Sequence, residues 1–181
     1  MRTCLTKGVA AAFALALPLA VAVSAQQTMP KPAAEMSQLA FFEGSWSCEG
    51  KMFATPMGPA GEMKSTAEIR KDLDGFFQTG TIKGNSPNMP PFEGRFYATY
   101  DPGMKRFVML WVDTMGGWAQ NTSTGWKGDV MVYEGDGHMG GQTFKGRDTF
   151  TKSGTTGMKH SWQMQVNGKW TPAGEETCQK K

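Results

Sequence analysis

From Gly44 onward, short segments of alternating apolar and polar residues are separated by glycine, proline, asparagine and aspartate. Alternation with a period of two is typical of strands that bury one face, and the intervening residues are those that turns require. The predicted strands are 45–54, 62–71, 76–83, 93–100, 105–113, 118–126, 130–134, 142–152, 158–166, 169–170 and 175–179. Asn167-Gly168 is the clearest hairpin turn among the connections. The pattern therefore predicts an all-β domain of short strands.

One helical segment precedes the strands. Residues 35–42 place Met36, Leu39 and Phe42 on or near one face, and a helix this short must pack on something to be stable. No segment is long enough for a crossover helix, so consecutive strands are expected to pair as a meander, which loses its edges most simply by closing. The predicted fold is a single up-and-down antiparallel β-barrel of about 8–10 strands with a short N-terminal helix.

The segment 105–113 differs from its neighbours because it is apolar on both faces. Phe107, Met109 and Trp111 share one face, and valine and leucine occupy the other. Such a pattern predicts a strand that is covered on both sides.

The first 25 residues have the pattern of a signal peptide. A short basic region precedes an apolar run over 9–23, and small residues lie at 23 and 25 where a signal peptidase cleaves. The apolar run is too short to predict a stable membrane anchor after cleavage. We expect a signal peptide at 1–25, a flexible segment at 26–34 and the barrel domain at 35–181, in a secreted protein of the bacterial periplasm.

Charge excludes two classes of partner. Without the signal peptide, 17 of the 19 Lys and Arg residues remain against 16 Asp and Glu. A near-neutral chain does not predict binding to nucleic acid or to an anionic membrane, which calls for a basic patch. The sequence leaves the oligomeric state open.

Two cysteines remain after loss of Cys4, Cys48 near the start of the domain and Cys178 near its end. In an oxidising compartment, a lone distant pair predicts a disulfide rather than a metal site. It would close a loop of roughly 130 residues, worth about 4–5 kcal/mol in the chain-entropy model. In a closed barrel the last strand pairs with the first, which would bring these two residues together.

Several short motifs carry a family resemblance. Gly44-Ser45-Trp46 after a helical turn resembles the opening of the lipocalin and calycin superfamily of β-barrels. The chain from Met36 to Lys180 more closely resembles the bacterial family known as domain of unknown function 1579. The matching motifs are Phe42-x-Gly44-x-Trp46, Leu73-Asp74-Gly75-Phe76-Phe77, Pro91-Phe92-x-Gly94, Tyr100-Asp101-Pro102, Arg106-Phe107-Val108-x-x-Trp111-Val112-Asp113, Gly125-Trp126 and Arg147-Asp148-Thr149-Phe150. The resemblance implies a lipocalin-like barrel and no assigned activity.

The aromatic content is compatible with a packed barrel core and with a ligand-binding interior. Six tryptophans are many for a domain of this size, and barrels of eight or more strands can hold a small ligand. The predicted ligand-binding residues are Phe107, Met109, Trp111, Trp118, His160, Trp162 and Met164. The leading hypothesis is a barrel that binds a small apolar or amphipathic ligand. The alternative is a structural or stress-related barrel with a filled core and no ligand.

Histidine offers a further alternative. His160 shares a strand face with Trp162, and in barrels related to nitrobindin a histidine of a late strand ligates haem. Met158 with His160, or His138 with Met139, would offer soft ligands to Cu(I), although such sites usually need several close ligands. We predict no metal site and no cofactor, with haem at His160 as the alternative.

Catalytic motifs are weak in this sequence. No serine lies in a Gly-x-Ser-x-Gly context, and no glycine-rich loop of the kind that cradles phosphate occurs. We predict no catalytic residue. An enzyme with Asp113, Arg147 or His160 at the barrel mouth is the third hypothesis.

Overall fold

The computed structural model describes residues 29–56, 58–87 and 90–181. The predicted signal peptide at 1–25 lies outside the described residues, as do the first three residues of the predicted flexible segment. Residues Lys31–Lys181 form one compact unit. Within the described part of the chain, no helix combines the length and hydropathy that crossing a membrane requires.

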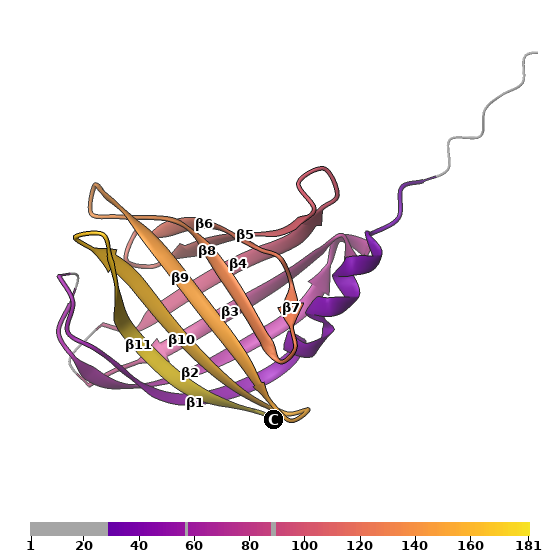
Figure 1. Cartoon of the computed structure of the whole chain (residues 1–181). Helices are drawn as coiled ribbons and strands as arrows, with labels where there is room; N and C mark the ends of the chain where they lie inside the picture. Colours follow the sequence, from indigo (N-terminus) through magenta and orange to yellow (C-terminus); the bar gives the residue numbers. More distant parts are fainter. Residues whose placement is uncertain (1–28, 57, 88–89) are drawn as a thin grey trace, which may run out of the picture. The chain divides into compact units, whose positions relative to one another are not determined.

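The compact unit is built almost entirely of strands (Figure 1). A 3₁₀ helix, η1 (Ala34–Phe42), precedes the first strand, and a short turn, η2 (Leu73–Gly75), separates β2 from β3. The strands are β1 (Gly44–Met52), β2 (Gly61–Asp72), β3 (Phe77–Asn85), β4 (Phe92–Asp101), β5 (Arg106–Asp113), β6 (Trp118–Ser123), β7 (Trp126–Lys127), β8 (Val130–Met139), β9 (Gln142–Ser153), β10 (Gly157–Val166) and β11 (Lys169–Lys180).

The strands close into an antiparallel barrel. Each of β1 to β5 pairs with the next strand, as does each of β8 to β10. Pairing of β1 with β11 and of β6 with β8 completes the circle. The two-residue β7 pairs with β8 beside the barrel. Ten strands therefore form the closed barrel, which confirms the predicted fold class.

The predicted strand 130–134 ends too early, because β8 continues to Met139 through the residues that the sequence assigned to a loop. Gly135 and Gly137 resemble turn residues in the sequence, but both lie in the strand. A Cβ at Gly135 would overlap the backbone oxygen of Gln120, and one at Gly137 would overlap the ring of Phe144. These glycines are therefore required for close packing between strands rather than for a turn.

Two other predicted boundaries also differ from the structure. The separate segments 169–170 and 175–179 form one strand, β11, in which a register shift opposite Trp162 and Gln163 accommodates Pro172. The single strand predicted at 118–126 is interrupted before β7, where Gly125 has a φ of +87° that favours glycine.

The outer face of β5 is not covered, contrary to the prediction for 105–113. Leu110 is 43% exposed and Val112 is 40% exposed. Phe107 and Met109 on the other face are buried. An apolar outer face therefore lies on the barrel surface, where single exposed apolar residues are common.

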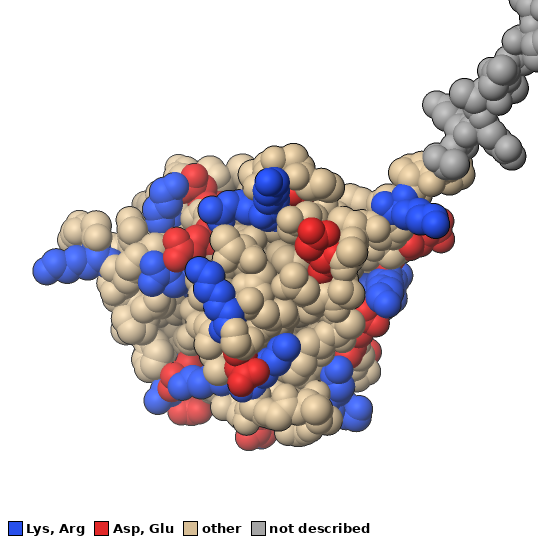
Figure 2. Space-filling model, turned by 45° about the vertical axis from the view of Figure 1, so that its right-hand side comes forward, with Lys and Arg blue, Asp and Glu red and all other residues tan. Residues whose placement is uncertain are grey.

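Charged side chains are interspersed on the visible surface. Figure 2 shows Lys and Arg among Asp and Glu on the face turned toward the reader. Several charged residues of the barrel form cross-strand ion pairs, such as Lys64 with Glu49 and Lys145 with Asp136. Exposed pairs of this kind add little stability each.

One end of the barrel is closed by η1, which lies near the C-terminus in Figure 1. Leu39 and Phe42 are buried from the helix side, against the fully buried Trp46 of β1. The indole nitrogen of Trp46 donates to the Phe42 carbonyl at 2.7 Å, and that of Trp126 donates to the Gln38 carbonyl at 2.8 Å. These two bonds fix a segment that is too short to be stable alone.

Candidate functional site

A cavity of about 470 Å³ lies inside the barrel. This volume falls within the range of small-molecule pockets. Inward-facing side chains of β2 to β5 form an apolar side, with Ile69, Ile82, Phe96, Met109 and Trp111 among them. The described parts of the loops at 53–60, 86–91 and 114–117, at the end opposite η1, also border the cavity.

Inward-facing glycines keep large rings against the barrel wall. Gly80 lies under the ring of Phe96, and Gly94 lies under the indole of Trp111. On the opposite side, the indole of Trp162 lies over Gly174 of the neighbouring strand. A Cβ at any of these three glycines would overlap the ring above it. The rings can therefore lie flat and leave the centre of the barrel open.

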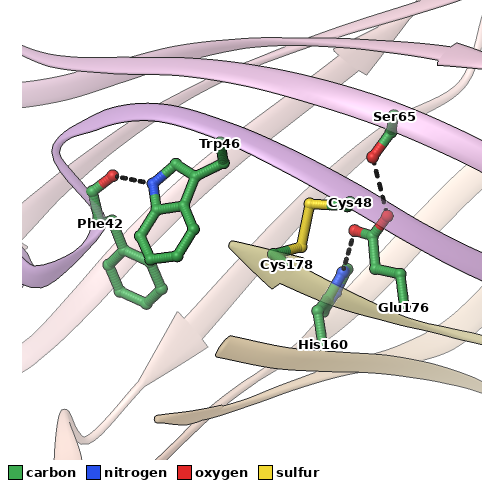
Figure 3. Close-up of a disulfide and its surroundings, with 7 residues drawn as sticks. All are labelled: Phe42, Trp46, Cys48, Ser65, His160, Glu176 and Cys178. Carbon is green, nitrogen blue, oxygen red and sulfur yellow. Dashed lines mark hydrogen bonds and ion pairs between the residues drawn. A yellow bond between two sulfur atoms is a disulfide. The ribbon is translucent and has the colours of Figure 1, made fainter. Parts of the chain in front are cut away.

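The other side of the cavity carries a hydrogen-bonded polar cluster that we call the acidic arc: Ser65, Asp148, His160 and Glu176. Figure 3 shows His160 and Ser65 on either side of the Glu176 carboxylate. Ser65 Oγ donates to Glu176 Oε2 at 2.8 Å, and His160 Nδ1 lies 3.1 Å from Glu176 Oε1. His160 Nε2 lies 3.0 Å from Asp148 Oδ1. Strands β2, β9, β10 and β11 each supply one member.

The environment of His160 favours its protonated form. Burial acts to lower the pKa of His160, but its hydrogen bonds to Asp148 and Glu176 and their charges outweigh burial and raise this pKa to about 9. For Glu176, burial acts to raise the pKa, whereas His160 and Ser65 hold it below its usual range. At neutral pH, both imidazole nitrogens therefore donate to carboxylates.

Aromatic rings enclose the imidazole. The ring of Phe150 stacks on His160, with centroids 4.4 Å apart and an interplanar angle of 5°. Trp162 lies on β10 with its centroid 5.2 Å from that of His160. Aromatic faces stabilise a neighbouring cation, so these rings add to the preference for an imidazolium.

Cys48 and Cys178 form a disulfide beside the acidic arc (Figure 3). This pairing confirms the disulfide prediction, and the two residues are opposite each other in the register of β1 and β11. Glu176 lies close to both sulfur atoms. The disulfide leaves no thiolate there to bind a metal ion.

Five of the seven predicted ligand-binding residues border the cavity with inward positions: Met109, Trp111, His160, Trp162 and Met164. Trp118 lies at its edge, is 46% exposed, and stacks on His138 with centroids 3.8 Å apart. Phe107 is 1% exposed and packs against Tyr100 in the core. Their roles in binding remain predictions.

The residues of the enzyme hypothesis all border the cavity, but they have separate hydrogen-bond partners. Asp113 accepts hydrogen bonds from the indole of Trp111 and from two backbone N–H groups of the loop at 114–117. Arg147 pairs with Glu134 at 2.7 Å and its guanidinium lies 4.0 Å from the centre of the Trp170 ring. Each is thus engaged apart from His160.

Geometry at His160 also bears on the haem alternative. A histidine needs a free lone pair on one nitrogen to ligate iron. Both nitrogens of His160 face carboxylate oxygens at about hydrogen-bond distance. Ligation would require Asp148 or Glu176 to move away, so this geometry favours a different role.

Sequence reasoning did not select Glu176, Asp148 or Ser65 as site residues. For Glu176 a signal was present: it lies two residues before Cys178, and side chains two apart share a strand face. Once the disulfide is placed inside the barrel, Glu176 must also point inward. A carboxylate in an apolar interior requires a hydrogen-bonding partner. His160, which the sequence places on the same strand face as Trp162, could provide it.

The comparisons place the chain in a family. The model of the family described as "Protein of unknown function (DUF1579)" matches residues 31–180. The chain belongs to this family. No curated protein matches the chain at a significant level.

Solved structures resemble the fold of this DUF1579 member. The crystal structure of Rv2717c from M. tuberculosis has a TM-score of 0.63 and 16% sequence identity, and the match covers 83% of this chain and 99% of that one. The S-type phycobiliprotein lyase CPES from Guillardia theta has a TM-score of 0.48 and 10% identity, over 83% of this chain and 98% of the lyase. A fluorescence-activating β-barrel designed de novo has a TM-score of 0.44 and 12% identity, over 78% of this chain and 95% of the designed one. At 16% identity the likeness to Rv2717c concerns the fold alone.

Proposed function

We propose that this DUF1579 member is a secreted protein of the bacterial periplasm that binds a small apolar or amphipathic ligand inside its barrel. The observation that carries the proposal is the cavity of about 470 Å³ with its mostly apolar lining. Secretion is supported by the signal-peptide pattern of residues 1–25.

The cavity favours ligand binding over the filled-core alternative. A filled core would place large side chains across the centre at interior packing density. Here, Phe96, Trp111 and Trp162 instead lie over glycines at the wall. A space of this size, apolar on one side and polar on the other, suits an amphipathic molecule.

Native mass spectrometry of the purified protein tests the proposal. A co-purified small molecule, or saturable binding of the neutral fluorescent probe N-phenyl-1-naphthylamine, is the expected result. If no bound mass is found and the probe does not bind, ligand binding is rejected and a filled or structural barrel is favoured.

A pair of variants on β2 localises the binding. Ala67 borders the cavity, and Thr66 beside it is exposed. Ala67→Phe should fill part of the cavity and weaken probe binding at least tenfold. Thr66→Phe adds a similar ring on the outer face and should leave binding unchanged. Circular dichroism of both variants checks that the barrel still folds.

A further inference from the structure

We infer that the ligand carries a positively charged hydrogen-bond donor, such as a protonated amine, and that this group binds the acidic arc at Asp148. This inference rests on the proposed ligand-binding function and specifies the chemical class of the ligand. It follows from which hydrogen-bonding groups of the cavity wall are already used.

The donors of the acidic arc are all occupied. Both nitrogens of His160 face carboxylates, and the hydroxyl of Ser65 donates to Glu176. Each oxygen of Glu176 therefore also has one partner. An incoming carboxylate or phosphate would find no free N–H or O–H group within these four residues, although the imidazolium is close.

Asp148 retains acceptor capacity. Its Oδ1 accepts from His160 at 3.0 Å, whereas the contact of its Oδ2 with Asn121 Nδ2 is long, at 3.5 Å. A carboxylate oxygen can accept two hydrogen bonds. The Asp148 side chain is 25% exposed, against 11% for Glu176, and it borders the cavity. It is the carboxylate that a ligand can reach.

The net charge of the acidic arc also favours a cationic group on the ligand. Two carboxylates face one imidazolium, so the cluster has one excess negative charge. Among the described residues that border the cavity, no lysine is present, and the guanidinium of Arg147 is engaged with Glu134. In a poorly solvated interior, a like charge is repelled strongly and an opposite charge is attracted.

Tyr133 supplies an independent observation. It lies directly opposite Asp148 in the register of β8 and β9, borders the cavity and is 2% exposed. Within the described part of the chain its hydroxyl has no hydrogen-bond partner. Burial raises the pKa of Tyr133, so this hydroxyl stays protonated. Because Tyr133 and Asp148 are paired across β8 and β9, the Tyr133 hydroxyl can accept from an ammonium group that binds Asp148.

The apolar side of the cavity defines the rest of the ligand. Met109, Phe96 and Ile82 lie on β5, β4 and β3, whereas the charged members of the acidic arc lie on β9 to β11. An alkyl or aryl body would contact these residues while its amine lies at Asp148 and Tyr133. The predicted ligand class is therefore an amphipathic amine.

A matched ligand series tests this class. Decylamine, decanol and decanoate share one alkyl chain and differ in their polar end, and at pH 7 the amine is cationic and the acid anionic. Each would compete with N-phenyl-1-naphthylamine below its micellar concentration. Decylamine should displace the probe at a concentration at least tenfold lower than decanoate, with decanol between them.

Isosteric variants assign the preference to the acidic arc. Asp148→Asn should reduce the amine-over-acid preference about tenfold or more, and Glu176→Gln should reduce it in the same direction. Asp136→Asn removes one carboxylate that pairs with Lys145 on the surface, and should leave the preference unchanged. If Asp148→Asn does not fold, Glu176→Gln and Tyr133→Phe provide the test in its place, since each should lower decylamine affinity.

The outcomes separate the two proposals. If none of the three ligands displaces the probe and no ligand co-purifies, the proposed function itself fails. If all three displace it equally, or decanoate displaces it best, the barrel binds ligands but the inferred amine class is wrong. A preference for decylamine that persists in Asp148→Asn would overturn the assignment to the acidic arc.

Discussion

His160 is the residue on which the polar side of the cavity depends. It separates two inward-facing carboxylates that would otherwise lie in the same interior without a cation. A buried charge is tolerated only when it is paired and hydrogen-bonded. Its side chain is 18% exposed, so solvent does little to screen these interactions.

His160→Gln should destabilise the protein by about 3 kcal/mol, because it leaves Asp148 and Glu176 facing each other without a positive charge. Urea unfolding at pH 7 measures this loss. The matched control is His138→Gln. His138 stacks on the half-exposed Trp118, and its replacement should cost about 1 kcal/mol or less. Equal effects of the two variants would contradict the special role of His160.

Stability should also depend on pH through His160. Folding raises its pKa from the usual 6.5 to about 9, so the folded state holds this proton more tightly. The resulting stabilisation is complete below pH 6.5 and is lost as the pH rises to about 9. This stabilisation is on the order of 3 kcal/mol. It comes from the carboxylates of Asp148 on β9 and Glu176 on β11, which favour the protonated imidazole.

Urea unfolding at pH 6, 7.5 and 9 measures the pH dependence. The difference in unfolding free energy between the wild type and His160→Gln should shrink as the pH rises through this window. Glu176 acts in the opposite range: its pKa is lowered on folding, so its contribution is lost as the pH falls into the acid range. A difference that stays constant from pH 6 to 9 would show that His160 is not held protonated.

At the level of single residues, the sequence identified individual members of the site but not their arrangement. Alternation predicted that His160 and Trp162 share a face, and both do border the cavity. Glu176 was treated only as part of a strand, because a glutamate is normally solvated. Its inward position depends on pairing with a strand more than 100 residues away, which local patterns do not encode.

Besides alternation, the positions of glycines within strands determine how the neighbouring strands pack. Sequence analysis assigned the glycines to turns, and several are turn residues with positive φ, such as Gly125 and Gly168. Others lie inside strands under aromatic rings of neighbouring strands. Single-strand patterns cannot distinguish the two classes, because the ring that covers a glycine comes from another strand. The end of β8 was therefore mispredicted.

Adding a methyl group under a ring should close part of the cavity. In Gly94→Ala and Gly174→Ala, the new Cβ would overlap the indole of Trp111 or Trp162, which must then swing inward. We expect a loss of about 1–3 kcal/mol in unfolding free energy from the strain. Binding of N-phenyl-1-naphthylamine should also weaken at least threefold. Titration of the probe and urea unfolding provide the two measurements.

Gly84→Ala is the matched control for these variants. Gly84 also lies in a strand beside an aromatic ring, but a Cβ there would make only an ordinary contact with Phe92 at 3.4 Å. Its probe binding should match that of the wild type. If Gly84→Ala weakens binding as much as Gly94→Ala does, flattening of the rings against the wall is not what keeps the cavity open.

For the whole molecule, closure of the barrel is the feature that the sequence predicted best. Turn signals between short alternating segments predicted a meander, and one lone cysteine pair predicted which strands would meet. The cavity was harder to foresee, since its volume depends on rotamers of many side chains at once. The same alternation is compatible with a filled interior, which is why both hypotheses arose from one pattern.

The disulfide should stabilise the closed barrel against separation of its first and last strands. Cys48 and Cys178 are 130 residues apart in sequence and lie opposite each other on β1 and β11. Reduction should lower the unfolding free energy by about 2–5 kcal/mol, because it releases a loop that spans most of the domain. Urea unfolding with and without dithiothreitol measures the change.

The double variant Cys48→Ala/Cys178→Ala is the control. It should match the reduced wild type and show no further change with dithiothreitol. Because the β1–β11 hydrogen bonds remain, both proteins should still bind N-phenyl-1-naphthylamine in the folded state. Unchanged stability on complete reduction, verified by thiol labelling, would mean that strand pairing alone holds the barrel closed.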